Sequence, residues 1–171
     1  MKTQNKLAQI ALAGILWMLG NHPMAFAAAT QTGETKMSHA AVEAAVDNFY
    51  AALNVMFTGD GKPVKDAWSH ADDVTYMGPG GDYLIGWKQV EKEWDRQAAA
   101  KLGGKVIPEK VHIVVGETLA FLNCVEAGQN VVKGKVEPVK LRSSTIFRKE
   151  NAAWKVVAHQ TDLLGYMSTP K

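Results

Sequence analysis

The chain has 171 residues, with 19 basic and 17 acidic side chains and a formal net charge of +2. This length fits one domain with a short extension. The near balance of charge argues against nucleic acid or an anionic membrane as the main partner, because both select strongly basic proteins. The single cysteine, Cys124, has no partner for a disulfide within the chain. Its apolar neighbours predict a buried structural thiol rather than a nucleophile.

Residues 1–27 have the pattern of an export signal peptide. Lys2 and Lys6 precede a mostly apolar run from Leu7 to Leu19, which is shorter than the roughly 20 residues that cross a bilayer. Ala25-Phe26-Ala27 follows as a cleavage pattern of small residues. Cleavage there removes two lysines and no acid, so the mature chain has a formal charge of zero. We predict a periplasmic or secreted protein without a membrane anchor; the alternative is that this segment forms the first helix of the fold.

The mature chain is expected to begin with a flexible, polar tether at residues 28–37. A long helix follows, which Ser38 can cap and whose apolar residues recur at helical spacing from Val42 to Phe57. Gly59 lies where that pattern stops. A short second helix is predicted around residues 63–69, since a proline fits its first turn.

The middle of the chain predicts a short hairpin and a third helix. Residues 73–77 are typical of a strand, the Gly/Pro-rich residues 78–81 of a turn, and residues 83–85 of a short return strand. Apolar residues at helical spacing then extend from Trp87 to Leu102, where two glycines stop the pattern.

The remainder predicts β-structure. Strands are expected at residues 105–115, 119–127, 139–148 and 154–161, and residues 128–137 are expected to be an exposed polar connection. Three helices followed by antiparallel strands are typical of an α+β fold. One domain is therefore predicted over residues 38–166, with a short tail at residues 167–171.

Five segments carry a likeness to a known family. They are Phe49-Tyr50-Ala51-Ala52-Leu53, Trp68-Ser69-His70-Ala71-Asp72-Asp73-Val74, Gly86-Trp87, Arg142-Ser143-Ser144-Thr145-Ile146-Phe147-Arg148-Lys149 and Trp154-Lys155-Val156-Val157-Ala158-His159-Gln160-Thr161-Asp162. With these segments, residues 42–164 resemble the SnoaL-like branch of the nuclear transport factor 2-like superfamily, to which ketosteroid isomerase also belongs. The resemblance implies a strongly curved, mixed or antiparallel sheet wrapped as a cone around the long first helix, with a pocket at its open end. It also implies a homodimer formed through the outer face of the sheet.

Proton-transfer chemistry has candidates at Asp72 and Asp73. Adjacent residues of an extended segment point to opposite sides, so at most one of them faces the pocket. Burial raises the pKa of a lone carboxyl, which suits a general base. The likeness to ketosteroid isomerase, whose Asp base works beside a Tyr, makes Tyr50 the candidate oxygen-holding residue. The alternative is structural: one aspartate caps a turn and the other pairs with a basic side chain.

Histidines offer a second set of candidates. His159 and Thr161 share a strand face, so His159 is a candidate to hold a ligand or move a proton. Two His–Asp pairs, His70 with Asp72 and His159 with Asp162, could bind a divalent metal if they converged. Their spacing matches no strong metal signature. We therefore predict neither a metal nor a cofactor.

Other residues fit a ligand site or the core equally well. Arg142 could bind a ligand carboxylate or form a structural ion pair, with Asp73 or Glu126 as the partner. Asn123 could donate to a ligand or be a satisfied core amide. The large aromatic residues could line the pocket or pack in the core; they are Trp68, Tyr76 and Trp87.

These patterns predict an exported protein that binds a small, partly apolar molecule in its pocket. Isomerase- or lyase-type proton transfer is the chemistry expected if it is an enzyme. The alternative is a non-catalytic dimerisation or assembly module with a vestigial pocket. Fold-level likeness does not choose between them, because this superfamily includes both enzymes and proteins without chemistry.

Overall fold

The computed structural model describes residues 24–167 and the side-chain surroundings of residues 36–167. The chain divides into two compact units, Met1–Glu34 and Thr35–Lys171. In the first unit, the described residues are helical. Residues 1–23 lie outside the described part, so the signal peptide stays a prediction. No helix within residues 24–167 combines the length and hydropathy needed to cross a membrane.

The first helix, α1 (Met24–Met56), begins earlier than the sequence predicted. Residues 28–37, expected to be a flexible tether, are helical in the structure. Extending a helix costs far less than starting one, so the helix continues through this segment although its threonines and Gly33 have low helix propensity. The predicted apolar spacing is confirmed, because Val42, Phe49 and Met56 are all fully buried.

The described residues contain three α-helices, one short 3-10 helix and a six-stranded sheet of order β2-β1-β6-β5-β4-β3. Besides α1, the elements are α2 (Lys62–Ala67), β1 (Thr75–Met77), β2 (Leu84–Ile85), α3 (Trp87–Ala100), β3 (Lys105–Val115), β4 (Leu119–Val132), β5 (Lys135–Glu150), β6 (Ala153–Thr161) and η1 (Gly165–Met167). The sheet is mixed, since β1 runs parallel to β6 and the other neighbours are antiparallel. The α+β class is therefore confirmed, whereas the strong curvature of a cone stays a prediction.

The connection between β4 and β5 is much shorter than expected. Residues 128–137 were predicted to be an exposed polar connection, but β4 and β5 continue through them and leave only Lys133 and Gly134 between the strands. Both residues have positive φ, 52° and 78°, as a two-residue hairpin turn requires. Most of these polar residues are exposed on a hairpin rather than in a loop, whereas Asn130 is buried and donates to the Gly103 carbonyl oxygen at 3.1 Å.

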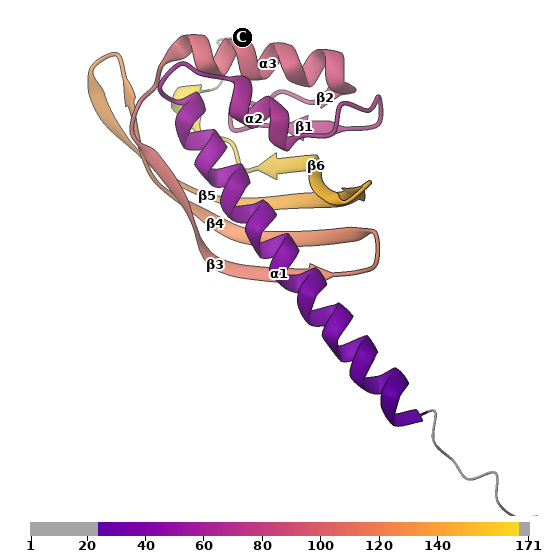
Figure 1. Ribbon diagram of the computed structural model, residues 1–171. Coiled ribbons are helices and arrows are strands. Elements are labelled where there is room, and N and C mark those ends of the chain that lie inside the picture. The colour runs from indigo at the N-terminus through magenta and orange to yellow at the C-terminus, as the bar shows by residue number, and fades with distance from the viewer. Residues whose placement is uncertain (1–23, 168–171) are drawn as a thin grey trace, which may run out of the picture. The chain divides into compact units, whose positions relative to one another are not determined.

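One face of the sheet is covered and the other is open. The second half of α1 crosses the covered face, with α2 and α3 at one end of it (Figure 1). We call this the inner face. Along β4 and β5 its residues are buried, and the residues between them are exposed or half-buried on the outer face. This alternation decides which polar side chains lie inside.

Candidate functional site

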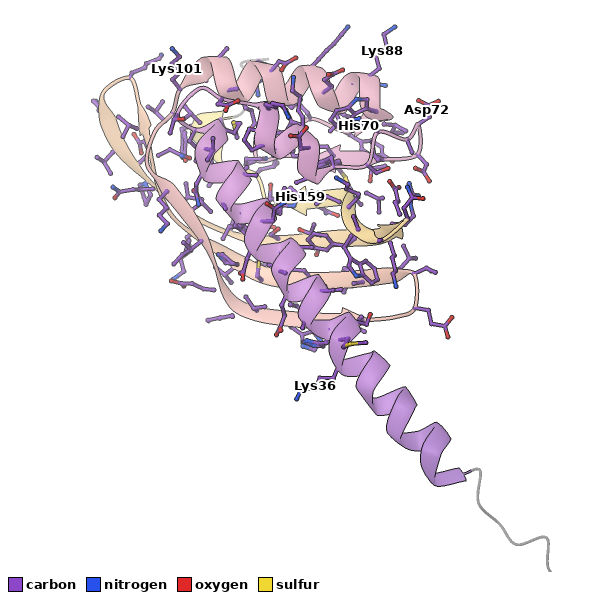
Figure 2. All side chains as sticks on the ribbon, in the orientation of Figure 1. Lys36, His70, Asp72, Lys88, Lys101 and His159 are labelled. Carbon is purple, nitrogen blue, oxygen red and sulfur yellow. The ribbon has the colours of Figure 1, made fainter. Side chains whose placement is uncertain are left out.

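A set of polar side chains from four elements lies on the inner face, where apolar residues would be expected. The set consists of Tyr50 of α1, Cys124 and Glu126 of β4, Thr145 of β5 and His159 of β6. Glu126 is 5% exposed and His159 is 4% exposed. Figure 2 marks His159 on its strand, beside α1. Buried ionisable groups of this kind are costly and commonly mark functional sites.

Short contacts join these side chains into one buried cluster. The Tyr50 hydroxyl donates to Glu126 Oε1 at 3.0 Å and lies 3.1 Å from Cys124 Sγ. His159 Nε2 lies 3.5 Å from the same Glu126 oxygen. On the other side of the ring, His159 Nδ1 lies 2.9 Å from Thr145 Oγ1. Tyr50 therefore holds Glu126 by a hydrogen bond, and the His159 ring lies beside the same carboxylate oxygen.

Aromatic rings fix the orientation of the imidazole. Phe49 meets the His159 ring edge-on at 5.2 Å between centroids, and Tyr76 stacks on it at 6.0 Å. Tyr76 is itself held, because Gln97 Nε2 donates to its hydroxyl at 2.8 Å and also donates to Glu93. This packing leaves the imidazole little freedom to turn away from Glu126.

The buried setting decides the charge of these groups. Burial lowers the pKa of His159, and the nearby Glu126 opposes that shift only in part. Burial, reinforced by Glu126 and Cys124, raises the pKa of the Tyr50 hydroxyl, so it remains a proton donor. Burial also raises the pKa of the Cys124 thiol. The expectation that Cys124 is buried is confirmed, and its raised pKa disfavours a thiolate nucleophile.

A partly enclosed space of about 40 Å³ adjoins this cluster of buried groups, and we call it the inner cavity. Glu126, His159 and Thr161 contribute to its wall. Thr161 Oγ1 is buried and has no hydrogen-bond partner among the described residues. A single water needs about 10–15 Å³ of such space, so the cavity fits a molecule of only a few heavy atoms. Its apolar wall includes Leu53, Phe57, Trp94, Val106, Val139 and Leu141.

The expectation that an aspartate faces the pocket is wrong for Asp72 and for Asp73. Both are exposed, and they lie in a turn before β1 rather than in a strand. The Arg148 guanidinium donates to both carboxylate oxygens of Asp73, at 2.6 Å and 3.1 Å, and it lowers the pKa of that carboxyl. The structural alternative, a pair with a basic side chain, is the one that the structure shows for Asp73.

The neighbouring aromatic residues divide between surface and interior. His70 stacks on Trp87 at 4.0 Å and its Nε2 lies 3.1 Å from the Lys65 carbonyl oxygen, so both rings lie away from the inner cavity. Figure 2 shows His70 and Asp72 apart from His159. Trp68 is buried in the core, whereas Tyr76 lines the inner cavity. No group of three or more potential metal ligands occurs within residues 24–167.

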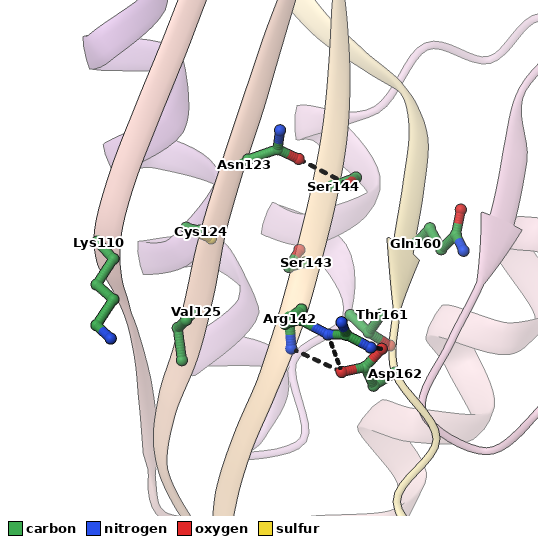
Figure 3. Close-up of a pocket in the computed structure, with 10 residues that line it drawn as sticks. All are labelled: Lys110, Asn123, Cys124, Val125, Arg142, Ser143, Ser144, Gln160, Thr161 and Asp162. Carbon is green, nitrogen blue, oxygen red and sulfur yellow. Dashed lines mark hydrogen bonds and ion pairs between the residues drawn. The ribbon is translucent and has the colours of Figure 1, made fainter.

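Arg142 and Asn123 lie on the outer face, not in the inner cavity. Arg142 is 84% exposed, and its guanidinium donates to both carboxylate oxygens of Asp162, at 2.9 Å and 3.1 Å. Asn123 accepts a hydrogen bond from Ser144 at 2.8 Å. Figure 3 shows these residues around an open hollow of about 470 Å³ on the sheet. The structural alternative, an ion pair, holds for Arg142, with Asp162 as the partner.

Glu126 was expected only as a partner of Arg142 and not as a site residue. A signal was present, because strict alternation along β4 puts Glu126 on the same face as Leu122 and Cys124. Thr161 was recognised only as a neighbour of His159. The candidate site is therefore Glu126, His159 and Thr161, with Tyr50 in a positioning role.

The low pKa of His159 predicts a pH-dependent stability. An unfolded histidine titrates near about 6.5. Below that pH, His159 binds a proton in the unfolded chain but stays neutral in the folded chain. The free energy of unfolding therefore falls as pH falls. The slope from this group reaches about 1.4 kcal/mol per pH unit. Urea unfolding between about pH 7 and pH 5 measures it.

The matched variants for this prediction are His159→Gln and His112→Gln. His112 is exposed on the outer face, so its loss should leave the pH slope nearly unchanged. The His159→Gln variant should have a clearly smaller slope, whatever its absolute stability. Equal slopes in the two variants would contradict the assignment of this pH dependence to His159.

The fold and the site together define a class: an α+β domain with polar groups enclosed between a long helix and a mixed sheet. A family profile described as a SnoaL-like domain matches residues 42–162. The chain therefore belongs to the SnoaL-like family, within the nuclear transport factor 2-like superfamily. No curated protein matches the chain.

Solved structures show the same fold at low identity. A proposed dehydratase of the NTF2-like family from Streptomyces avermitilis is 20% identical, with a TM-score of 0.65 over 75% of this chain and 98% of that chain. A proposed calcium/calmodulin-dependent protein kinase type II association domain from Thiobacillus denitrificans is 21% identical, with a TM-score of 0.59 over 71% and 94%. A proposed aromatic ring hydroxylase from Novosphingobium aromaticivorans is 17% identical, with a TM-score of 0.63 over 75% and 90%. These likenesses show the fold alone.

Proposed function

We propose that this protein binds a small, neutral carbonyl compound in the inner cavity and moves a proton on it. The observation that carries the proposal is a carboxylate and an imidazole, both more than nine-tenths buried, at a cavity with largely apolar walls. Such a pairing of apolar walls with a few polar groups is typical of small-molecule sites. The unpartnered Thr161 hydroxyl supports it, because a ligand oxygen would satisfy that group.

The proposed reaction is an isomerisation next to a carbonyl. The Glu126 carboxylate takes a proton from the carbon beside the carbonyl, and the C–H electron pair forms a carbon–carbon double bond. The carbonyl π electrons move to oxygen, and the Thr161 hydroxyl donates a hydrogen bond to the resulting enolate. Glu126 then returns the proton to the original carbon or, in a conjugated substrate, to a more distant one. Tyr50 and His159 position the carboxylate throughout.

Binding can be tested with acetone, a carbonyl compound of few enough atoms for the inner cavity. Trp94 lines that cavity, and its indole N–H, which has no hydrogen-bond partner within residues 36–167, is the NMR reporter. Its resonance should shift saturably, while that of Trp154 should not. Thr161→Val should weaken binding about five- to tenfold through the lost hydrogen bond, and Thr118→Val, at an exposed turn, should not. A non-saturable Trp94 shift would contradict binding.

The assembly alternative has its own supporting observation. Val114, Phe121 and Ile146 lie side by side on the outer faces of β3, β4 and β5, and no described element covers them. We propose that this row forms the centre of a homodimer interface. Sedimentation should show a dimer that Phe121→Lys converts to monomer. Val136→Lys, at an exposed site on the hairpin, is the control, and a dimer that tolerates Phe121→Lys would contradict this interface.

The two functions are separated by the same measurements. A dimer that shows no saturable acetone shift at Trp94 would favour the assembly module.

We also propose export to the periplasm, because Lys2, Lys6, the apolar run to Leu19 and the small residues before Ala28 form a signal pattern. The amino-terminal sequence of the exported protein should begin at Ala28. Exported protein with an intact amino terminus would contradict cleavage there.

A further inference from the structure

Two partly open spaces share the same pair of lining side chains. The inner cavity has a volume of about 40 Å³, and a second hollow of about 180 Å³ lies between the end of α3 and η1. Gln97 and Met167 line both spaces. We propose that the two form one binding site for an unbranched apolar chain with a neutral carbonyl head. The head would lie at Glu126 and the tail would pass Met167 into the second hollow. This inference rests on the proposed function.

Met167 is the side chain that can move between the two spaces. Gln97 is buried and held by its hydrogen bonds to Tyr76 and Glu93. Met167, in contrast, is unbranched and flexible, and no side-chain hydrogen bond from the described part of the chain holds it. It belongs to a single turn of 3-10 helix, where its backbone N–H donates to the Leu164 carbonyl at 2.9 Å. A rotamer change at Met167 is therefore the simplest way to join the spaces.

The residues that line the two spaces favour a ligand with a neutral head and an apolar tail. An anionic head would meet the Glu126 carboxylate in a buried site, where like charges repel strongly. The second hollow is lined by Ala100, Leu102, Val132 and the Tyr166 ring. Its single cation, Arg96, already donates to both carboxylate oxygens of Glu93, at 2.7 Å and 2.6 Å. An acidic tail would therefore find no free cation there.

The test is a chain-length series of straight methyl ketones, from butanone to nonanone. If the tail enters the second hollow, each added methylene should tighten binding about fourfold, the value expected for burial of one methylene. Affinities come from titration of the Trp94 indole resonance. Ala100→Trp should fill the second hollow from an exposed helix position without touching the inner cavity. Ala99→Trp, at the neighbouring exposed position outside that lining, is the matched control.

The expected result is a steep length dependence in the wild type and in Ala99→Trp, and a flat one in Ala100→Trp. Butanone should bind all three proteins alike. Parallel length dependences in the two tryptophan variants would overturn the two-part site while leaving binding in the inner cavity intact. Failure of every ketone, butanone and acetone included, to shift the Trp94 resonance would overturn the proposed function and this inference together.

Discussion

Replacing Glu126 by glutamine is expected to slow the protein-catalysed exchange of acetone methyl protons for deuterium by at least about a hundredfold. General-base catalysis by a positioned side chain contributes a factor of this size or more. The amide keeps the shape of the carboxylate and can still accept the hydrogen bond from Tyr50, but it cannot take a proton from carbon. The measurement is the loss of the acetone methyl signal in D2O, followed by NMR and corrected for exchange without protein.

Acetone exchange separates chemistry from binding. Glu109→Gln, at an exposed position on the outer face, makes the same chemical change without reaching the cavity and should exchange at the wild-type rate. Tyr50→Phe should have an intermediate effect, because Glu126 keeps its carboxyl group and loses only a positioning hydrogen bond. If the wild type exchanges acetone protons no faster than Glu126→Gln while acetone still binds, the protein binds this ligand without catalysing proton transfer.

Gly128→Ala is expected to lower the free energy of unfolding by about 3 kcal/mol or more. A Cβ at this position would lie 1.9 Å from the Lys105 carbonyl oxygen. That oxygen belongs to the backbone of β3, which pairs with β4 through Val106 and Gly128, so relief requires separating the strands. The glycine also has a φ of 153°, which residues with a side chain rarely adopt. Overpacking and backbone strain each contribute about 1–3 kcal/mol.

Gly134→Ala is the matched control for this loss of stability. Gly134 also has a positive φ, 78°, but a Cβ there would meet no atom within 4 Å. Its substitution should therefore lower the free energy of unfolding only by the cost of the backbone conformation, about 1–2 kcal/mol. Urea unfolding of both variants gives the comparison. Equal losses would show that the close approach of β3 and β4 at Gly128 contributes nothing beyond its backbone conformation.

The β4–β5 region shows why strand boundaries were harder to predict than strand identity. Alternating apolar residues identified the middle of both strands, because the core covers only one face there. Beyond Gly128 the hairpin carries polar residues such as Gln129 and Lys135, and this composition hid its continuation. Backbone hydrogen bonds between the strands sustain it, and these depend on the partner strand rather than on the local sequence.

The sequence by itself determined the class of fold, the apolar face of the long helix from Val42 to Met56, His159 as a candidate site residue and the family resemblance. The helix and the strands follow from periodicity and residue type, which are local properties, whereas the family resemblance rests on five particular segments. Alternation along β4 places Glu126 on one face with Leu122, but only the tertiary structure decided that this face is covered and that Asp72 and Asp73 lie outside. The physical reason is that the burial of a carboxylate depends on which strands and helices cover it. Arg148 reaches Asp73 across the fold, and α1 covers Glu126 from a distant part of the chain.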